Sequence, residues 1–148
     1  MATVELSFTA LPEHVRTARL VATAVARRSG VDESLLDEVR LAVGEACSRA
    51  VEGHQLYCPA EPVRLALTDL AGRFEVEVTD NCRPGTRWPA GQAPSATTAG
   101  GLDTDSNGGL PHALGIAVIE GLADDVQISE TAAGTSIRMS WPSAGTTR

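Results

Sequence analysis

The segment 36–54, with the sequence LDEVRLAVGEACSRAVEGH, places the strongest constraint on how this chain can fold. Its apolar residues follow the i, i+3, i+4, i+7 spacing of an amphipathic helix, and they are Leu36, Val39, Val43, Ala46, Cys47 and Ala50. At about 100° per residue, Glu45 and Arg49 lie together on the opposite side of this helix. The rest of the chain must therefore supply a sheet for the apolar face and loops around the polar face.

The segments before this helix are predicted to form one strand and one helix. Apolar and polar residues alternate over 3–8, which predicts a short strand. Pro12 stands at the start of a helical pattern, where its missing N–H costs nothing, and this pattern continues to about Arg28. Asp32 is the expected N-cap of the helix over 36–54, and Gly53 is where that helix is expected to fray.

Two pairs of strands and a third helix follow. Alternation over 63–68 and 74–79 predicts two antiparallel strands, and Asp80 ends the second. Residues 112–122 have a helical pattern, and two short strands follow, with Gly134 at the turn between them. Strands in hairpins and helices in a separate layer predict an α+β two-layer sandwich.

The chain length favours a single domain over residues 1–148. Residues 82–111 show no periodicity and are rich in Gly, Pro, Ser, Thr and Ala. A segment of this length in a compact domain is typically a functional lid or disordered. Residues 142–148 are expected to form a frayed tail.

The composition limits the class of partner. The formal net charge is -7 at pH 7, and every basic residue is Arg. An acidic chain without a basic cluster is a poor nucleic-acid binder, because phosphate contacts supply most of that affinity. The charge therefore favours a protein partner or a small ligand.

The cysteines and the hydropathy bear on location. Cys47, Cys58 and Cys82 are odd in number and lack metal-binding spacing, which favours free thiols in a reducing compartment. No apolar run approaches the ~20 residues that a membrane span needs, and the N-terminal residues do not read as a signal peptide. These features predict a cytoplasmic protein.

Four short segments carry polar residues or glycines within or next to the predicted elements. They are EACSRAV at 45–51, Asp80, GGLPHALGIAVIEGLADDV at 108–126, and Gly134-Thr135. In this order the chain resembles the histidine-kinase-like ATPase (GHKL) superfamily, and within it most closely the bacterial anti-sigma-factor serine kinases. The resemblance implies the Bergerat ATP-binding fold, in which a mixed sheet carries helices on one face.

The first motif reads E-A-x-x-N-A-V in the family. Glu45 matches the family's catalytic base, which orients a substrate hydroxyl or water against the γ-phosphate. Arg49 replaces the Asn that offers an amide oxygen to Mg²⁺, an ion that prefers hard oxygen ligands. A guanidinium has no acceptor, so the resemblance implies that Arg49 disfavours Mg²⁺ but can contact phosphate directly. The family's later His falls at Gly53, with His54 one place on.

The second motif reads D-x-G-x-G in the family. Asp80 is retained, which implies that it receives the adenine amino group, whereas Cys82 and Pro84 replace the two glycines. Gly134 and Thr135 match the family's Gly-Thr turn. The resemblance implies that Thr135 supports the adenine-binding Asp80.

The third motif reads roughly G-G-x-G-L-x-L-I in the family. Gly108, Gly109 and Gly115 match it, while Ala113 takes the place of a glycine. The resemblance implies that these glycines, with the helix N-terminus, receive phosphates. The following segment 120–126 is closely similar to the anti-sigma branch.

Each candidate also has a purely structural interpretation. Glu45 and Arg49 are spaced as an i, i+4 surface ion pair, which contributes about 0.2–0.5 kcal/mol. Asp80 at the end of a strand is commonly a turn residue. The paired glycines are compatible with a plain linker. His54 and His112 lack companion ligands, so no metal site is expected.

The resemblance implies a bacterial regulatory protein that binds a sigma factor or an STAS-type anti-sigma antagonist. Because Arg49 replaces the family Asn, binding of ATP or ADP is expected to be weak and Mg²⁺ to be disfavoured. One open alternative is an active Ser/Thr protein kinase that phosphorylates an antagonist with Glu45 as base. A second is a metal-independent nucleotide sensor with Arg49 on the phosphates. Homodimerisation is also expected, since the first strand often supports it in this family.

Overall fold

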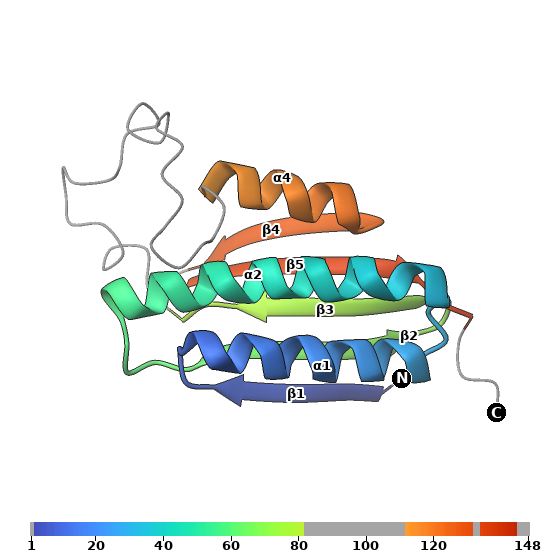
Figure 1. Ribbon diagram of the computed structural model, residues 1–148, viewed down its shortest axis with the longest axis horizontal. Helices are drawn as coiled ribbons and strands as arrows, with labels where there is room; N and C mark the ends of the chain where they lie inside the picture. Colours follow the sequence, from blue (N-terminus) through green and yellow to red (C-terminus); the bar gives the residue numbers. More distant parts are fainter. Residues whose placement is uncertain (1, 82–111, 132–133, 145–148) are drawn as a thin grey trace.

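The computed structural model describes residues 2–81, 112–131 and 134–144, which form a sheet covered by helices (Figure 1). Their elements are β1 (Ala2–Phe8), α1 (Pro12–Arg28), the 3-10 turn η1 (Glu33–Leu35), α2 (Leu36–Tyr57), β2 (Val63–Leu70), β3 (Arg73–Thr79), α4 (His112–Leu122), β4 (Asp125–Thr131) and β5 (Gly134–Pro142). The predicted order of strands and helices is confirmed. The predicted lid at 82–111 lies outside the described residues.

The five strands are ordered β1-β2-β3-β5-β4, and α1, α2 and α4 lie over the same face of the sheet (Figure 1). This arrangement confirms the α+β two-layer sandwich with helices on one face. The four strand pairings among the described residues are all antiparallel, so the expectation of a mixed sheet is wrong in that detail. β3 and β4 do run in the same direction, but β5 lies between them and prevents a parallel ladder.

The core lies between the sheet and the helices. β2 buries Val63, Leu65 and Leu67, and β3 continues the same alternating pattern toward the helix layer. α1 meets this layer with small side chains, since Ala18 and Ala22 are fully buried. With only 3% aromatic residues in the chain, the close approach of the helices gives aliphatic side chains a dense core.

Two cysteines differ in state. Cys47 is free and fully buried on the apolar stripe of α2, and burial raises the pKa of its thiol to about 12, against a smaller lowering by Arg19. Cys58, at the C-terminal end of α2, is disulfide-bonded, which corrects the expectation that its thiol is free. An odd count of cysteines does not exclude one pair, so the free-thiol argument for a reducing compartment does not hold for Cys58.

The ends of α2 differ from those predicted. Asp32 caps the 3-10 turn instead of α2 itself, through its side chain and the Ser34 backbone N–H at 3.0 Å. The expected fraying at Gly53 is wrong, because α2 continues to Tyr57. The Cys58 N–H bonds the His54 carbonyl at 2.8 Å and closes the last turn.

The C-terminal strand reaches past the predicted start of the tail. β5 runs to Pro142, the Ser143 N–H donates to the Gly72 carbonyl at 3.0 Å, and the Ala144 N–H donates to the Gly30 carbonyl at 2.9 Å. Residues 145–148 lie outside the described part of the chain. No helix in residues 2–81, 112–131 and 134–144 is both long and apolar enough to cross a bilayer.

Candidate functional site

A cavity of about 250 Å³ lies between α2, α4 and the strands β3, β4 and β5. It is lined by Ala46, Arg49 and Ala50 of α2, Val78 of β3 and the following Asp80, Ile116 of α4, Ile128 and Glu130 of β4, and Thr135 and Ile137 of β5. Three of the predicted site residues, Arg49, Asp80 and Thr135, therefore border one cavity although they are far apart in the sequence.

Asp80 follows the last residue of β3 and has only 4% of its surface exposed. Its backbone N–H donates to the Thr135 carbonyl at 2.9 Å, and the Thr135 N–H donates to Asp80 Oδ1 at 3.1 Å. These reciprocal bonds continue the β3–β5 pairing by one residue. They fix the carboxylate of Asp80 against the wall of the cavity through the backbone of Thr135.

Gly134 allows the chain to pass close to Asp80. Its φ of 151° is unfavourable for an L side chain, and a Cβ here would lie 2.0 Å from the Asp80 carbonyl oxygen and 2.8 Å from Oδ1. The turn therefore requires glycine at this position. This is the physical reason for a Gly-Thr pair at the start of β5.

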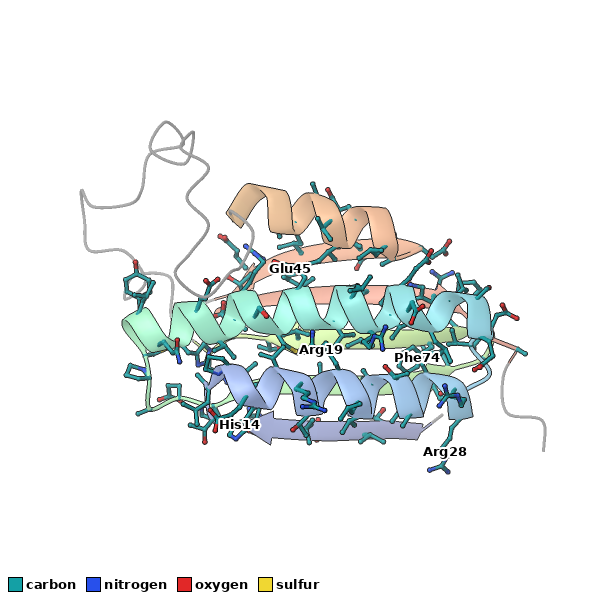
Figure 2. The ribbon with its side chains drawn as sticks, in the orientation of Figure 1. His14, Arg19, Arg28, Glu45 and Phe74 are labelled. Carbon is teal, nitrogen blue, oxygen red and sulfur yellow. The ribbon has the colours of Figure 1, made fainter. Side chains whose placement is uncertain are left out.

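Arg49 and Glu45 lie one helical turn apart on α2. Arg49 lines the cavity, whereas Glu45 does not and extends from the α4 side of α2 (Figure 2). Burial raises the pKa of the half-buried Glu45 carboxyl, and the nearby Arg49 charge opposes that shift. The Glu45 carboxylate is thus a stronger base than an exposed glutamate. Of the two side chains, it is the Arg49 guanidinium that borders the cavity.

The glycine motif is only partly described. Gly115 belongs to the first turn of α4, and the next residue, Ile116, lines the cavity, so this turn borders the site. Gly108 and Gly109 lie outside the described residues.

His54 does not line the cavity, but it contacts the backbone next to Asp80, a role that its sequence context did not predict. It is fully buried, its Nδ1 lies 2.7 Å from the Glu61 carbonyl, and its Nε2 accepts the Asn81 N–H at 2.9 Å. Because Nε2 accepts a hydrogen bond, the ring proton is on Nδ1, which donates to the Glu61 carbonyl. The ring therefore joins the end of α2 to the residue after Asp80. The sequence signal for its burial was its position on the apolar stripe of the helix, four residues after Ala50.

Arg49 cannot serve as a ligand of Mg²⁺ at this cavity. Arg49, at the position of the family Asn, has donors and no acceptor. Mg²⁺ requires oxygen ligands in near-octahedral geometry, and a guanidinium supplies none. In the part of the chain that the structure describes, no group of three or more His, Cys, Asp and Glu side chains could hold a metal ion.

A five-stranded sheet with helices on one face, and a cavity between them beside a buried aspartate, is consistent with the Bergerat ATP-binding fold, although the described strands pair only antiparallel. Residues 8–141 match the family model of the histidine kinase-like ATPase domain. The chain therefore belongs to this family, which confirms the resemblance to the GHKL superfamily.

One solved structure with a similar fold contains the RsbU and RsbW domains of Rv1364c from Mycobacterium tuberculosis. The TM-score is 0.62 at 19% sequence identity, and the similarity covers 95% of this chain and 32% of that one. The chain thus spans about a third of that structure's length, and at this identity the similarity shows the fold. No curated protein matches the chain.

The hydrogen bonds of His54 predict a large loss of stability on substitution. His54→Ala leaves the Glu61 carbonyl and the Asn81 N–H without their partner, and each unsatisfied buried group costs about 1–3 kcal/mol. We expect the free energy of unfolding, measured by urea denaturation, to fall by about 2–4 kcal/mol. His14→Ala is the control, because His14 is half-buried and we expect less than about 1 kcal/mol. Equal losses in the two variants would contradict this role.

Gly134→Ala tests the close approach to Asp80. We expect a loss of at least about 3 kcal/mol in thermal or urea unfolding, since the added Cβ meets backbone that cannot move without breaking the Thr135 bonds. Gly72→Ala is the control: Gly72 also has positive φ, at 79°, but nothing lies near its added Cβ. This variant should lose only about 1–2 kcal/mol, and a similar loss in both variants would show that conformation alone matters.

The raised pKa of Glu45 predicts a pH-dependent stability. The folded state holds this proton more tightly than the unfolded state, so its contribution is complete below the ordinary value of 4.5 and is lost as pH rises through the raised value. Glu45→Gln should therefore gain stability relative to wild type between about pH 4 and pH 7, by less than about 1 kcal/mol because solvent screens a half-exposed group. Urea unfolding across this range is the measurement, and a difference that does not change with pH would argue against the shift.

Proposed function

We propose that the chain is a regulatory protein of the anti-sigma-factor type that binds a sigma factor or an STAS-type antagonist, with weakened or lost use of Mg-ATP. The observation that carries the proposal is the position of Arg49, which lines the same cavity as Asp80 where the family has its Mg²⁺-binding Asn. The domain retains the family's fold while this residue changes the chemistry of its pocket.

Two further features support the anti-sigma branch. The segment 120–126 is closely similar to this branch, and the similar solved structure contains an RsbW domain. β1 lies at one edge of the sheet and pairs only with β2 among the described strands, which leaves an edge for the expected homodimer. A cytoplasmic location belongs to the same proposal, because sigma factors act there.

The electrostatics of the cavity support the loss of Mg-ATP use. Two unit charges about 4 Å apart interact by about 4 kcal/mol at an effective dielectric constant of 20, and a divalent ion doubles that value. Beside Mg²⁺, Arg49 would add repulsion of this order and would withhold an oxygen ligand. Asp80 and Glu130 bring negative charge to the same lining, but they do not replace the amide oxygen that Arg49 withholds.

An active Ser/Thr protein kinase is the second candidate. The raised pKa of Glu45 favours it, because a general base works best when its pKa approaches the working pH. This candidate predicts transfer of phosphate from ATP to an antagonist protein, and loss of that transfer in Glu45→Ala. Labelled ATP with purified STAS-type proteins distinguishes it from the main proposal, which predicts no labelled product.

Arg49→Asn restores the family residue and tests directly whether Arg49 weakens the binding of Mg-ATP. We expect wild-type protein to bind ATP no more tightly with Mg²⁺ than with EDTA, and Arg49→Asn to gain at least about tenfold in affinity with Mg²⁺ by calorimetry. Arg40→Asn is the matched control on an exposed part of the same helix, and it should behave as wild type. Micromolar binding of ATP by the wild type that depends on Mg²⁺ would overturn the proposal.

The partner is tested independently of nucleotide. Purified chain is mixed with each sigma factor and STAS-type protein of the same bacterium, and complexes are detected by size-exclusion chromatography. We expect one of them to form a stable complex in EDTA. Failure of all of them would contradict the regulatory role and would leave the nucleotide chemistry of the pocket unaffected.

A further inference from the structure

Cys58, the residue that ends α2, takes part in a disulfide and is half-buried. The chain has two other cysteines, and Cys47 is free and fully buried in the core. Within one chain, Cys82 is therefore the cysteine that remains as the partner of Cys58, and it follows Asn81 directly in the sequence. Cys82 itself lies outside the described residues, but its neighbour Asn81 does not.

Asn81 is hydrogen-bonded to the chain on both sides of Cys58. Its backbone N–H donates to His54 Nε2 at 2.9 Å, and its side-chain amide donates to the Pro62 carbonyl at 2.6 Å. His54 precedes Cys58 by four residues, and Pro62 follows it by four. A disulfide requires Cα atoms about 4.4–6.8 Å apart, which only neighbouring segments provide. These two hydrogen bonds therefore hold the segment that ends at Asn81 against the turn that contains Cys58, without need of the disulfide.

The two segments that meet at Cys58 also carry residues of the cavity. α2 bears Arg49, β3 is followed by Asp80, and both residues line the cavity. The C-terminal ends of α2 and β3 lie at the same end of the sheet (Figure 1). A disulfide at Cys58 therefore adds a covalent link to the hydrogen bond of His54, at the place where the helix layer meets the end of the strand. The oxidation state of Cys58 thus affects how tightly this end of the cavity is held.

The setting of Cys58 favours a disulfide that forms and breaks. Part of this residue is open to solvent, whereas Cys47 is sealed in the core. In a reducing cytoplasm, thiols are kept reduced, and the disulfides that do form are typically transient and respond to the redox state. This step rests on the cytoplasmic location that belongs to the proposed function.

We propose that a disulfide between Cys58 and Cys82 is a reversible redox switch that ties the end of α2 to the chain after Asp80. A dithiol reductant breaks the S–S bond by thiol–disulfide exchange: each cysteine gains a thiol hydrogen, and the reductant leaves as its own disulfide. The reduced form keeps the hydrogen bonds of Asn81 but loses the covalent link. The last turn of α2 and the residue after Asp80 then open more often, which loosens one end of the cavity.

The first test counts the thiols of the full chain and locates the disulfide. After treatment with oxidised glutathione, unfolding in guanidinium should expose one thiol, that of Cys47, and dithiothreitol should raise the count to three. Mass spectrometry of a non-reduced digest should find Cys58 linked to Cys82. Three thiols in the oxidised sample, or a link between two chains, would overturn the switch.

Hydrogen exchange of the full chain measures the loosening. On reduction, the backbone amides of Cys58 and Asn81 should exchange at least about tenfold faster, because both lie in the tied segments. The Ser143 amide, which bonds the Gly72 carbonyl at the far end of the sheet, is the control and should change by less than about twofold. Unchanged exchange at both Cys58 and Asn81 would contradict the proposal.

Two variants separate the disulfide from other effects of a reductant. Cys58→Ser should unfold at the same temperature with and without dithiothreitol, about 5–10 °C below the oxidised wild type. Cys47→Ala is the control, since it lacks the free thiol but keeps the disulfide, and its unfolding temperature should still fall by a similar amount on reduction. An equal response to dithiothreitol in Cys58→Ser and the wild type would overturn the proposal. Failure to bind any sigma factor or antagonist would instead contradict the regulatory role, and the thiol counts, exchange rates and unfolding temperatures would still decide whether the switch exists.

Discussion

The site depends on the close passage of the Gly134-Thr135 turn beside Asp80. Without a side chain at Gly134, two hydrogen bonds can form between Asp80 and Thr135, one between backbone groups and one from the Thr135 N–H to the Asp80 carboxylate, and β5 can pair with β3 up to the edge of the cavity. That pairing places β5 between β3 and β4, which gives the sheet its order and makes it wholly antiparallel. This close contact therefore holds the buried carboxylate at the end of β3, beside the cavity.

The second determinant of the site is the positive charge of Arg49, which stands on α2 where the family has a neutral Asn. α2 holds Arg49 over the cavity because the stripe from Leu36 to His54 packs onto the sheet, and this packing does not depend on what residue 49 is. A neutral amide there would offer an oxygen, whereas a guanidinium offers only donors and a positive charge. The fold can thus be retained while the preferred ligand changes, which is why the fold alone does not establish function in this family.

The order and type of the elements could be predicted because each has its own hydrophobic period, and the start of α2 at Leu36 agrees with that prediction. The neighbours within the sheet could not, since alternation shows which face is buried but not which strand lies alongside. For the site, the motifs identified Arg49, Asp80 and Thr135, which the structure brings to one cavity. His54 was missed because its partners are backbone groups, which carry no signature in the sequence.

The pairing of β3 with β5 also has a consequence for how the chain can vary. Thr79 faces Ser136 across the two strands, so this pairing joins two residues that are 57 positions apart in the sequence. The entropy of loop closure grows only slowly with length, by about 0.6 kcal/mol for each doubling. A moderate change in the length of chain between Thr79 and Ser136 should therefore change the entropic cost of this pairing only slightly.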